Sequence, residues 1–539
     1  MRAYCWRLFC LAGVLSVFVL PGCRHKETAA DGIDLVPESK LGARIGSVAN
    51  VPMPQPASVA GYGLVGGLAG TGSGDCPPAV REYLRRYIMT QLPTGGRDVD
   101  KLIDSKNTAV VRLEAVIPAA WQDEHFDVRV SLLAGSEAVS LQGGWLYKAE
   151  LTPAGTVGGT ARAIATVEGP VFIDRIGAGK PSLREGYILG GGRAAILFQG
   201  MLALRQADYL LASRIRNRLN ERYGTGTADA LSPAVIGLRI PAEYRRRRLR
   251  FISMVAATYL DQTQELIEAR INTLVHQLAV GDKKENSEVA LEALGRESLA
   301  KLGALLQASD EEVRLRAARC MLNLGDDRGF GTLREIALDP KSQRRLEALD
   351  AVVTGAPRND AAALAQRLLR DSEPAIVISA YERLRELDDP AVMPTLVGRS
   401  FYIEQVSGTS HKAIYVTRSG DPRIVLFGAP LTCRKNLFAE SPDGVVMVNA
   451  TPGQDYVSVI RRHPTRPGVI GPLATSFDVA DIIRTLGSES GQPKGGGPAG
   501  LDVTYSDVVV LMEQLVAKEA VAAQFWPGPL PKLSLIIKK

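Results

Sequence analysis

The sequence lacks the residue patterns on which most enzyme and metal sites depend. No H-E-x-x-H, G-x-S-x-G or Walker A sequence occurs in its 539 residues. Its histidines show no metal-ligand spacing with one another or with the cysteines. They are His25, His125, His276, His411 and His463. The sequence therefore predicts no metal site, no cofactor and no enzymatic activity.

Strong charge and long apolar runs are also missing. The formal net charge is only +6, and no basic stripe is interleaved with aromatic residues, which argues against a nucleic-acid partner. Beyond the N-terminus no stretch reaches about 18 apolar residues, so no membrane-spanning helix is expected there. One segment is strongly charged, the run of four arginines Arg245–Arg248. This run favours a solvated edge or turn over a patch that binds phosphate or peptidoglycan.

Cysteine is scarce, and its positions exclude a disulfide-rich scaffold. Two of the six cysteines, Cys5 and Cys10, lie within residues 1–22. If Cys23 is lipidated, three thiols remain in the mature chain and can form at most one disulfide. These are Cys76, Cys320 and Cys433.

What the sequence does contain begins with an export signal. Arg2 and Arg7 precede the apolar run Leu8–Leu20, which is too short to span a bilayer comfortably, and small residues follow it. This order is typical of a secretory signal peptide. The chain is therefore expected to leave the cytoplasm.

The end of that signal resembles the lipobox of bacterial lipoproteins. Leu20-Pro21-Gly22-Cys23 fits the pattern at leucine, glycine and cysteine, whereas proline is an unusual occupant. In that family the cysteine takes a diacylglyceryl group and becomes the mature N-terminus. The resemblance predicts a lipoprotein signal peptide at residues 1–22, lipidation of Cys23 and a tether at residues 23–43. The alternative is an ordinary signal peptide cut nearby.

Residues 44–262 are predicted to form an α+β region. Thr108–Pro118 and Phe126–Leu133 are short runs rich in Val and Leu, which are typical of strands. Pro78–Leu92 and Ala207–Tyr223 have apolar residues at helical spacing. The two kinds of segment alternate without a regular βαβ order.

Residues 263–400 are predicted to be all-helical, because Ala, Leu, Glu and Arg dominate and strand signals vanish. An internal repeat occurs at a constant offset of 63 residues, with a weaker copy about halfway that includes Leu346, Ala348 and Val352. The matched positions are Val313, Leu315, Ala317, Met321, Leu324 and Asp326 with Ile376, Ile378, Ala380, Leu384, Leu387 and Asp389. A period near 31 residues resembles HEAT or armadillo repeats, which are usually binding surfaces. An irregular helical bundle is the alternative.

Residues 401–539 are predicted to form a small α+β domain. Strand signals return, Ser488–Gly500 has the composition of a flexible linker, and Ser506–Ala522 has helical spacing. The expected strands are Ala413–Thr417, Arg423–Phe427, Gly444–Val448 and the strand-like Lys532–Lys538.

The most distinctive segment is the glycine-rich stretch Gly61–Gly72, which contains G-x-G-x-x-G. A dinucleotide site needs a buried strand before this motif and a helix N-terminus after it. Three prolines in Val51–Val59 argue against a central strand, and Gly70–Pro78 is unsuited to a helix. The segment is therefore predicted to be a loop whose backbone packs closely against another backbone.

The same segment carries a resemblance to a known family. Gly61-Tyr62-Gly63-Leu64-Val65-Gly66-Gly67-Leu68-Ala69-Gly70-Thr71-Gly72 resembles the signature of flagellar P-ring proteins. Other blocks resemble the family in the same order along the chain. They are Lys106–Val111, Phe126–Ser131, Ser140–Gly144, Glu168–Val171, Ala212–Gly224, Leu238–Pro241 and, more weakly, Leu501–Ala523. The helical segment 263–400 has no counterpart in the family, and residues 401–490 match it poorly.

The resemblance implies P-ring-like domains interrupted by the helical segment. It implies a structural, non-catalytic subunit of a homo-oligomeric ring around the flagellar rod in the periplasm, with rod and L-ring proteins as partners and peptidoglycan as a further candidate. With the lipobox, it implies a basal-body protein tethered to a membrane, the outer membrane being favoured. The alternative is a lipid-anchored envelope adaptor, unrelated to motility, whose helical repeats bind a partner protein.

A ring of identical subunits needs two complementary patches on each subunit. The candidate packing residues serve contacts either within the subunit or with its neighbour. They are Gly61, Tyr62, Gly63, Leu64, Val65, Gly67, Leu68, Gly70, Thr71, Gly72, Gly143 and Gly144.

A peptidoglycan hydrolase would need a nucleophile with a base, or paired carboxylates. The polar cluster worth naming for this is Glu114, Asp123, Glu124 and His125. It lies at a predicted strand end, where a solvated loop is the favoured interpretation.

Overall fold

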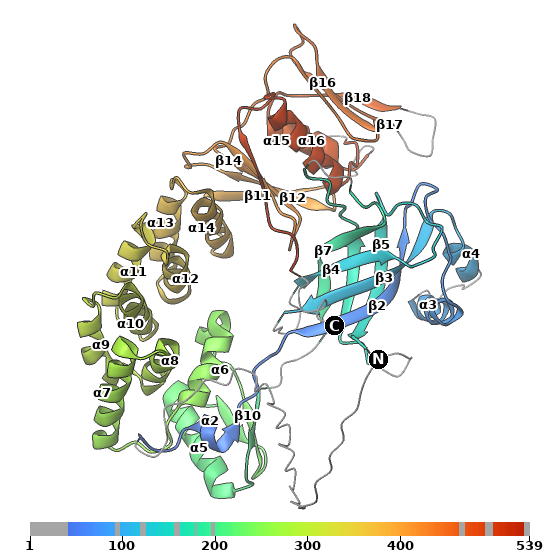
Figure 1. Cartoon of the computed structure of the whole chain (residues 1–539). Helices are drawn as coiled ribbons and strands as arrows, with labels where there is room; N and C mark the ends of the chain where they lie inside the picture. The colour runs from blue at the N-terminus through green and yellow to red at the C-terminus, as the bar shows by residue number, and fades with distance from the viewer. Residues whose placement is uncertain are drawn as a thin grey trace, which may run out of the picture.

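The computed structural model describes residues 41–91, 98–118, 125–155, 162–177, 181–195, 200–462, 469–490 and 500–532. Within these ranges the chain contains several sheets and a long run of helices (Figure 1). The predicted mixture of helices and strands in a multidomain chain is confirmed. Cys23 and most of Lys532–Lys538 lie outside the described residues.

The first large element is a closed six-stranded barrel whose neighbouring strands are all antiparallel. Around the barrel its strands are β2 (Ala57–Gly66), β3 (Thr108–Ile117), β4 (His125–Leu132), β7 (Glu185–Ala194), β6 (Ala165–Pro170) and β5 (Trp145–Pro153). The predicted strands at 108–118 and 126–133 are thus confirmed as β3 and β4. On β3, Val111 and Leu113 pack in the barrel interior, whereas Val110 packs outside against α3 (Pro78–Gln91) and α4 (Val99–Ile103).

The prediction that Gly61–Gly72 is a loop is wrong for its first half. β2 continues to Gly66 and pairs with β3 on one edge and β5 on the other. The prolines that argued against a strand end at Pro56, one residue before β2 begins. Gly61 and Gly63 therefore occupy the barrel wall, where Leu146 and Leu151 fill the space that larger side chains would take.

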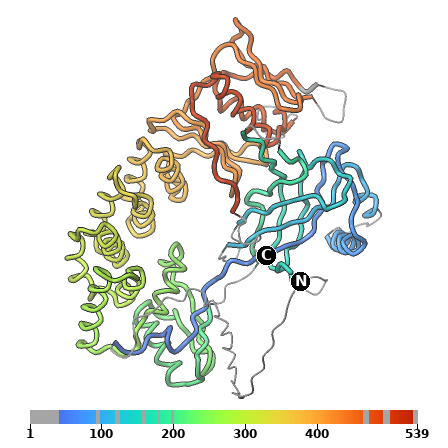
Figure 2. Tube along the Cα trace, in the orientation of Figure 1, coloured from blue at the N-terminus to red at the C-terminus, as the bar shows by residue number. Residues whose placement is uncertain are grey.

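A smaller unit, which we call the four-stranded unit, is separate from the barrel (Figure 2). It is built from residues that come before the barrel strands in sequence and from residues that come after them. Its sheet has the order β1 (Ala49–Asn50), β8 (Met201–Leu204), β10 (Val235–Leu238) and β9 (Ala228–Ala230). Its helices are α2 (Ile45–Val48), α5 (Tyr209–Tyr223), η1 (Ala242–Arg247) and α6 (Arg248–Ala257). Leu202, Ile236, Ile215 and Phe251 are fully buried in one core between sheet and helices.

Helices then follow one another to residue 386, and Figure 1 shows them as an arc from α6 to the C-terminal sheets. They are α7 (Gln264–Val280), α8 (Lys284–Leu294), η2 (Arg296–Ser298), α9 (Leu299–Leu305), α10 (Glu311–Asn323), α11 (Arg328–Leu338), α12 (Arg345–Gly355), α13 (Arg358–Leu368) and α14 (Pro374–Glu386). Alternate helices contact one another and form a row: α8 contacts α10, α10 contacts α12 and α12 contacts α14. We call α7 to α14 the helical run.

The helical run ends earlier than residue 400, where the sequence places its end. The strand β11 already begins at Val392, because Asp388 adopts a left-handed conformation with φ +48° and Pro390 follows. Both features are incompatible with continuing a helix.

The C-terminal unit contains two sheets with α15 (Val479–Gly487) and α16 (Tyr505–Ala517) between them (Figure 1). One sheet has the order β11 (Val392–Val397), β12 (Phe401–Val406), β14 (Arg423–Phe427), β13 (Ala413–Val416) and β19 (Gln524–Pro527). The other has the order β15 (Leu437–Glu440), β16 (Val446–Ala450), β17 (Val457–Arg462) and β18 (Val469–Thr475). The predicted strands at 413–417, 423–427 and 444–448 and the closing helix at 506–522 are confirmed within a few residues.

Candidate functional site at the junction of the barrel and the C-terminal unit

Two loops hold the second half of the glycine segment in place. The backbone N–H of Gly72 donates to the carbonyl oxygen of Lys106 at 2.8 Å, and that of Leu68 donates to Asn107 at 3.0 Å. The hydroxyl of Thr71 donates to the carbonyl oxygen of Ser140 at 3.0 Å. Three blocks that resemble the family in sequence therefore form one hydrogen-bonded structure.

Several glycines of this structure have no room for a side chain. A Cβ at Gly61 would overlap the carbonyl oxygen of Glu150, and one at Gly72 would overlap that of Thr108. At Gly63 a Cβ would lie 2.8 Å from Leu146 Cδ1, and at Gly144 it would overlap Val65 Cγ1. These close contacts join β2 to β5 and to the turn before β5, and they join the segment after β2 to the start of β3.

Other glycines of the segment are exposed and have free space around them. Gly70 and Gly143 have positive φ angles of +84° and +71°, and no atom lies within 4 Å of the place where their Cβ would be. Gly67, with φ +79°, meets only the carbonyl oxygen of Gly143 at 3.6 Å. These glycines are needed for the turn itself, and their outward faces are free. Tyr62 is also exposed, whereas Leu64, Val65 and Leu68 are buried.

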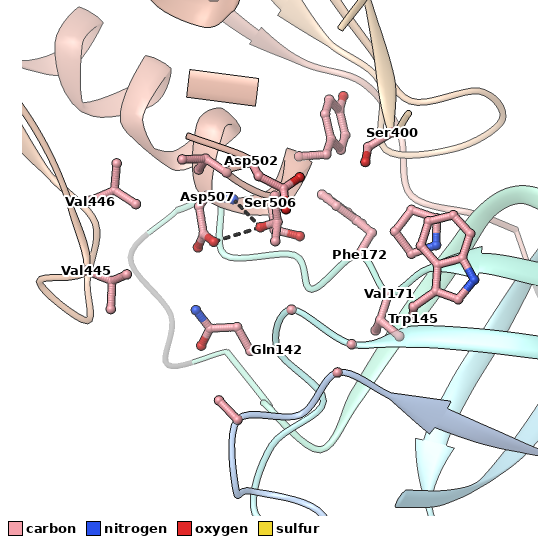
Figure 3. Close-up of a pocket in the computed structure, with 18 of the residues that line it drawn as sticks. Gln142, Trp145, Val171, Phe172, Ser400, Val445, Val446, Asp502, Ser506 and Asp507 are labelled. Carbon is pink, nitrogen blue, oxygen red and sulfur yellow. Dashed lines mark hydrogen bonds between the residues drawn. The ribbon is translucent and has the colours of Figure 1, made fainter. Parts of the chain in front are cut away.

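The glycine turns form one wall of a cavity of about 970 Å³ between the barrel and the C-terminal unit. Figure 3 shows Gln142, Trp145 and Val171 on the barrel side, facing Val446, Ser506 and Asp507. The cavity thus brings together family-like blocks that are separated by more than half of the chain. These are the glycine segment, Ser140–Gly144, Glu168–Val171 and Leu501–Asp507.

Direct hydrogen bonds cross the junction on either side of this cavity. The backbone N–H of Ile173 donates to Ser506 Oγ at 3.1 Å, and Gln142 Nε2 donates to Asp443 Oδ2 at 2.8 Å. Phe172 packs on Tyr505 with ring centroids 5.6 Å apart. The contact therefore combines apolar packing with satisfied polar groups, as a stable interface does.

A buried ion pair reinforces the junction. Arg175 Nη1 lies 3.2 Å from Asp507 Oδ1, and their side chains are only 6% and 12% exposed. Burial raises the pKa of Asp507, although hydrogen bonding to Thr504 and the charge of Arg175 act to lower it. Thr504 caps α16 by accepting from the N–H of Asp507 and donating to its carboxylate at 2.7 Å. The start of α16 is thereby locked against the barrel.

Asp127 forms a second contact across the junction. Its carboxylate accepts from the backbone N–H of Gly190 at 2.7 Å within the barrel and from that of Gly420 at 2.9 Å in the C-terminal unit. Burial raises the pKa of Asp127, while the two backbone N–H groups act to lower it.

This raised pKa makes the junction sensitive to pH. A carboxyl group whose pKa is higher in the folded state than in the unfolded state stabilises the fold when it is protonated. This contribution to the free energy of unfolding is complete below the unfolded pKa of about 3.9 and is lost as the pH rises through the folded pKa. Asp127→Asn cannot ionise, so we expect its stability to fall less than that of the wild type between pH 4 and pH 7 in urea unfolding. Asp127→Ala leaves both N–H groups without this acceptor and is expected to lose about 1–3 kcal/mol at either pH. Equal pH dependence in the wild type and Asp127→Asn would contradict the assignment.

The remaining candidates do not join this site. Glu114 pairs with Arg112 at 2.6 Å, His125 is exposed at the start of β4, and Asp123 and Glu124 lie outside the described residues. Of the basic run, Arg245 and Arg246 are exposed in η1.

Cys76, Cys320 and Cys433 form no disulfide in the part of the chain that the structure describes. In that part no group of three His, Cys, Asp or Glu side chains is arranged to hold a metal, and no helix is long and apolar enough to cross a membrane.

Sequence reasoning missed Asp127, Arg175 and Asp507 as functional residues. Asp127 stands at a polar position of the alternating strand pattern Phe126–Leu132, as Arg129 and Ser131 do, so the pattern gave no sign of its burial. Its partner Gly420 lies 293 residues away in sequence, so no local pattern could identify the contact.

The junction is a packing and hydrogen-bonding contact between two parts of the chain. The family model described as flagellar P-ring protein matches residues 44–283. The flagellar P-ring protein of Wolinella succinogenes is 30% identical over 256 residues, covering 44% of this chain and 69% of that protein. This chain belongs to the flagellar P-ring protein family.

Two further relatives show the same extent of similarity. The flagellar P-ring protein of Anaeromyxobacter dehalogenans is 30% identical over 258 residues, which are 43% of this chain and 65% of that protein. That of Nitrosomonas europaea is 31% identical over 249 residues, which are 42% of this chain and 64% of that protein. The chain thus spans about two thirds of the length of these relatives. The helices from α8 onward lie almost entirely beyond the matched family segment.

Proposed function

We propose that this chain is a structural, non-catalytic subunit of a flagellar P ring, or of a P-ring-like ring, around the rod in the periplasm. Membership of the family carries the proposal. The matched segment 44–283 contains the barrel and the four-stranded unit, and the glycine structure lies in that barrel. Self-association into a ring, contacts with rod and L-ring proteins, and contact with peptidoglycan are parts of the proposal.

The exposed members of the glycine segment support a role in contacts between subunits. A closed ring needs two different complementary patches on each subunit. Gly70 leaves its outward face free and Tyr62 is exposed on the same barrel, whereas Gly143 and Trp145 line the cavity that faces the C-terminal unit. Close approach of a neighbouring backbone is easiest at glycine, because no Cβ separates the two chains.

The function is tested by deleting the gene in the organism that carries it. We expect purified basal bodies imaged by electron microscopy to lack the P ring, and the cells to lose motility. An intact ring and normal motility would support instead an envelope adaptor unrelated to motility.

Glycine variants test the site within the same assay. Gly70→Asn and Gly143→Asn retain a residue that tolerates positive φ and are expected to fold, yet to reduce ring assembly at least about fivefold. Gly63→Val is unsuited to this question, because its side chain would enter the barrel interior against Leu146 and Leu113. Normal assembly by both Asn variants would assign the glycine segment to intramolecular turns alone.

For the helical run we propose HEAT-like stacking that presents a surface to a partner protein. The contacts of α8 with α10, α10 with α12 and α12 with α14 support a regular row. The same spacing recurs in sequence, since Leu294-Gly295 and Leu324-Gly325 both end helices of this row with glycine at positive φ. We further propose an export signal at 1–22, a tether at 23–43 and a domain at 44–262. The boundary between the helical domain and the C-terminal domain is proposed at Val392, where β11 begins, instead of at residue 400.

We also propose that Cys23 is lipidated and holds the chain to a membrane, with the outer membrane favoured. The lipobox-like order Leu20-Pro21-Gly22-Cys23 supports this. Two or more acyl chains anchor a protein stably, because each buried CH₂ contributes about 0.8 kcal/mol.

A further inference from the structure

Tyrosine side chains gather on the outer face of the barrel. Tyr62 and Gly66 point to the same side of β2, because side chains alternate along a strand. The ring of Tyr147, on β5, lies over Gly66, with its hydroxyl oxygen 2.5 Å from the place where a Cβ of Gly66 would be. Tyr62 and Tyr147 are 36% and 47% exposed, so both offer surface to a partner.

The helix α3 brings two more tyrosines to this side of β2. Leu64 lies between Tyr62 and Gly66 on the same side and belongs to the apolar cluster that holds α3 against the outside of the barrel. Tyr83 packs against that cluster, and Tyr83 and Tyr87 stack with ring centroids 6.2 Å apart. We call Tyr62, Tyr83, Tyr87 and Tyr147 the tyrosine face.

Two carboxylates lie among these rings. Glu150 is opposite Thr166 of β6, and Glu168 follows on the same side of that strand. The side chains next to them in sequence pack in the barrel interior, so both acids point outward. Burial raises the pKa of Tyr83 to about 12, and the charge of Glu150 acts in the same direction. Both acids act in this way on Tyr87. In the described ranges neither carboxylate has a hydrogen-bond or ion-pair partner.

The four-stranded unit has the opposite charge. Its residues 41–50 and 200–262 include twelve arginines, no lysine and five acidic residues. Arg245 and Arg246, in η1, are exposed. Among the described residues neither has a hydrogen-bond or ion-pair partner. We call these two residues the arginine pair.

We propose that the tyrosine face of one subunit binds the arginine pair of the next subunit, a second copy of this chain. The inference rests on the ring proposed above. Arginine suits the tyrosine face because its planar guanidinium stacks on aromatic rings and pairs with carboxylates. The face offers both kinds of partner, and tyrosine and arginine are the residues that carry much of the binding energy in protein interfaces.

The two surfaces do not meet within one chain. Figure 1 shows α3 on the side of the barrel that faces away from the four-stranded unit and the helical run. A contact between two different patches is heterologous, and a closed ring of identical subunits is built from contacts of this kind. The second copy therefore explains why one chain carries both surfaces.

Photo-crosslinking tests the contact in basal bodies assembled by cells that carry the full gene. Tyr147 is replaced by the photoreactive residue p-benzoylphenylalanine, and the products are analysed by mass spectrometry. We expect a product of two chains that is joined within residues 239–250 of the second chain. Products joined only to a rod protein, to glycan strands or within one chain would overturn the proposal.

Charge reversal tests the complementarity of the two surfaces. Glu150→Arg/Glu168→Arg and Arg245→Glu/Arg246→Glu are each expected to reduce the number of rings per cell at least about tenfold, because like charges then face each other. The chain with all four changes restores opposite charges and is expected to assemble within about threefold of the wild type.

Glu137→Arg/Glu335→Arg is the matched control, because it makes the same change in net charge at two other exposed acids. It is expected to assemble as the wild type does, and circular dichroism and thermal unfolding confirm that each variant is folded. Equal ring numbers in the wild type and every variant would overturn the contact and leave the ring in place. Loss in both reversals without recovery in the chain with all four changes would also overturn the contact. Absence of rings in the wild type would instead overturn the proposed function.

Discussion

Replacing Glu288 by glutamine is expected to destabilise the helical run by about 3–5 kcal/mol. The Glu288 carboxylate on α8 is fully buried and accepts from Arg250 of α6 at 2.7 Å, from Arg319 of α10 at 2.6 and 2.7 Å, and from Arg316 at 3.1 Å. It therefore joins the three helices α6, α8 and α10. Glutamine has nearly the same shape but leaves the three arginines without this negative charge. Urea unfolding followed by circular dichroism measures the loss.

Glu347→Gln is the matched control for that change. Glu347 also contacts two arginines, Arg319 at 3.0 Å and Arg344 at 3.1 Å, but its side chain is 33% exposed. Water screens such a pair, so the loss is expected to stay below about 1 kcal/mol. Losses of the same size at Glu288 and Glu347 would contradict the importance of burial.

The pH dependence gives an independent measure of Glu288. Burial acts to raise its pKa, but the charges and hydrogen bonds of Arg250, Arg319 and Arg316 outweigh it and lower the pKa to about 2. A carboxyl with a lowered folded pKa contributes stability above its unfolded value of about 4.3, and this stability is lost as the pH falls through the folded pKa. Wild-type stability is thus expected to fall between pH 4.5 and pH 2 more steeply than that of Glu288→Gln.

Replacing Gly72 by alanine is the second change with a large expected effect, a loss of about 3 kcal/mol or more. The new Cβ would overlap the carbonyl oxygen of Thr108 and lie 2.9 Å from that of Lys106. Both are backbone atoms, one at the start of β3 and one in the turn before it, so they cannot rotate away as a side chain would. The barrel must shift to accept the methyl group, and thermal unfolding measures the cost.

Gly70→Ala is the control within the same segment. Nothing lies within 4 Å of its Cβ position, and its φ of +84° alone opposes alanine, at a cost of about 1–2 kcal/mol. A Gly72→Ala protein that is as stable as Gly70→Ala would show that the glycine segment is not closely packed against β3.

Local sequence pattern predicted many of the strands and helices, because each depends on the spacing of its own side chains. The strands β3 and β4 and the helices α3, α5 and α16 follow from periods of two or 3.6 residues. The glycine segment was recognised as a packing device but placed in a loop, because the prolines before it suggested an interrupted strand. What made it a strand was pairing with β3 and β5, and those partners lie tens of residues away.

By itself the sequence determined the family and the order of helical and strand-rich segments, since each depends on residues close together in the chain. Only the tertiary structure decided that the helical run returns the C-terminal unit to the barrel. It alone placed Asp127 against Gly420 and Arg175 against Asp507. Such contacts depend on strand register and on how whole units pack, and many distant residues set both together.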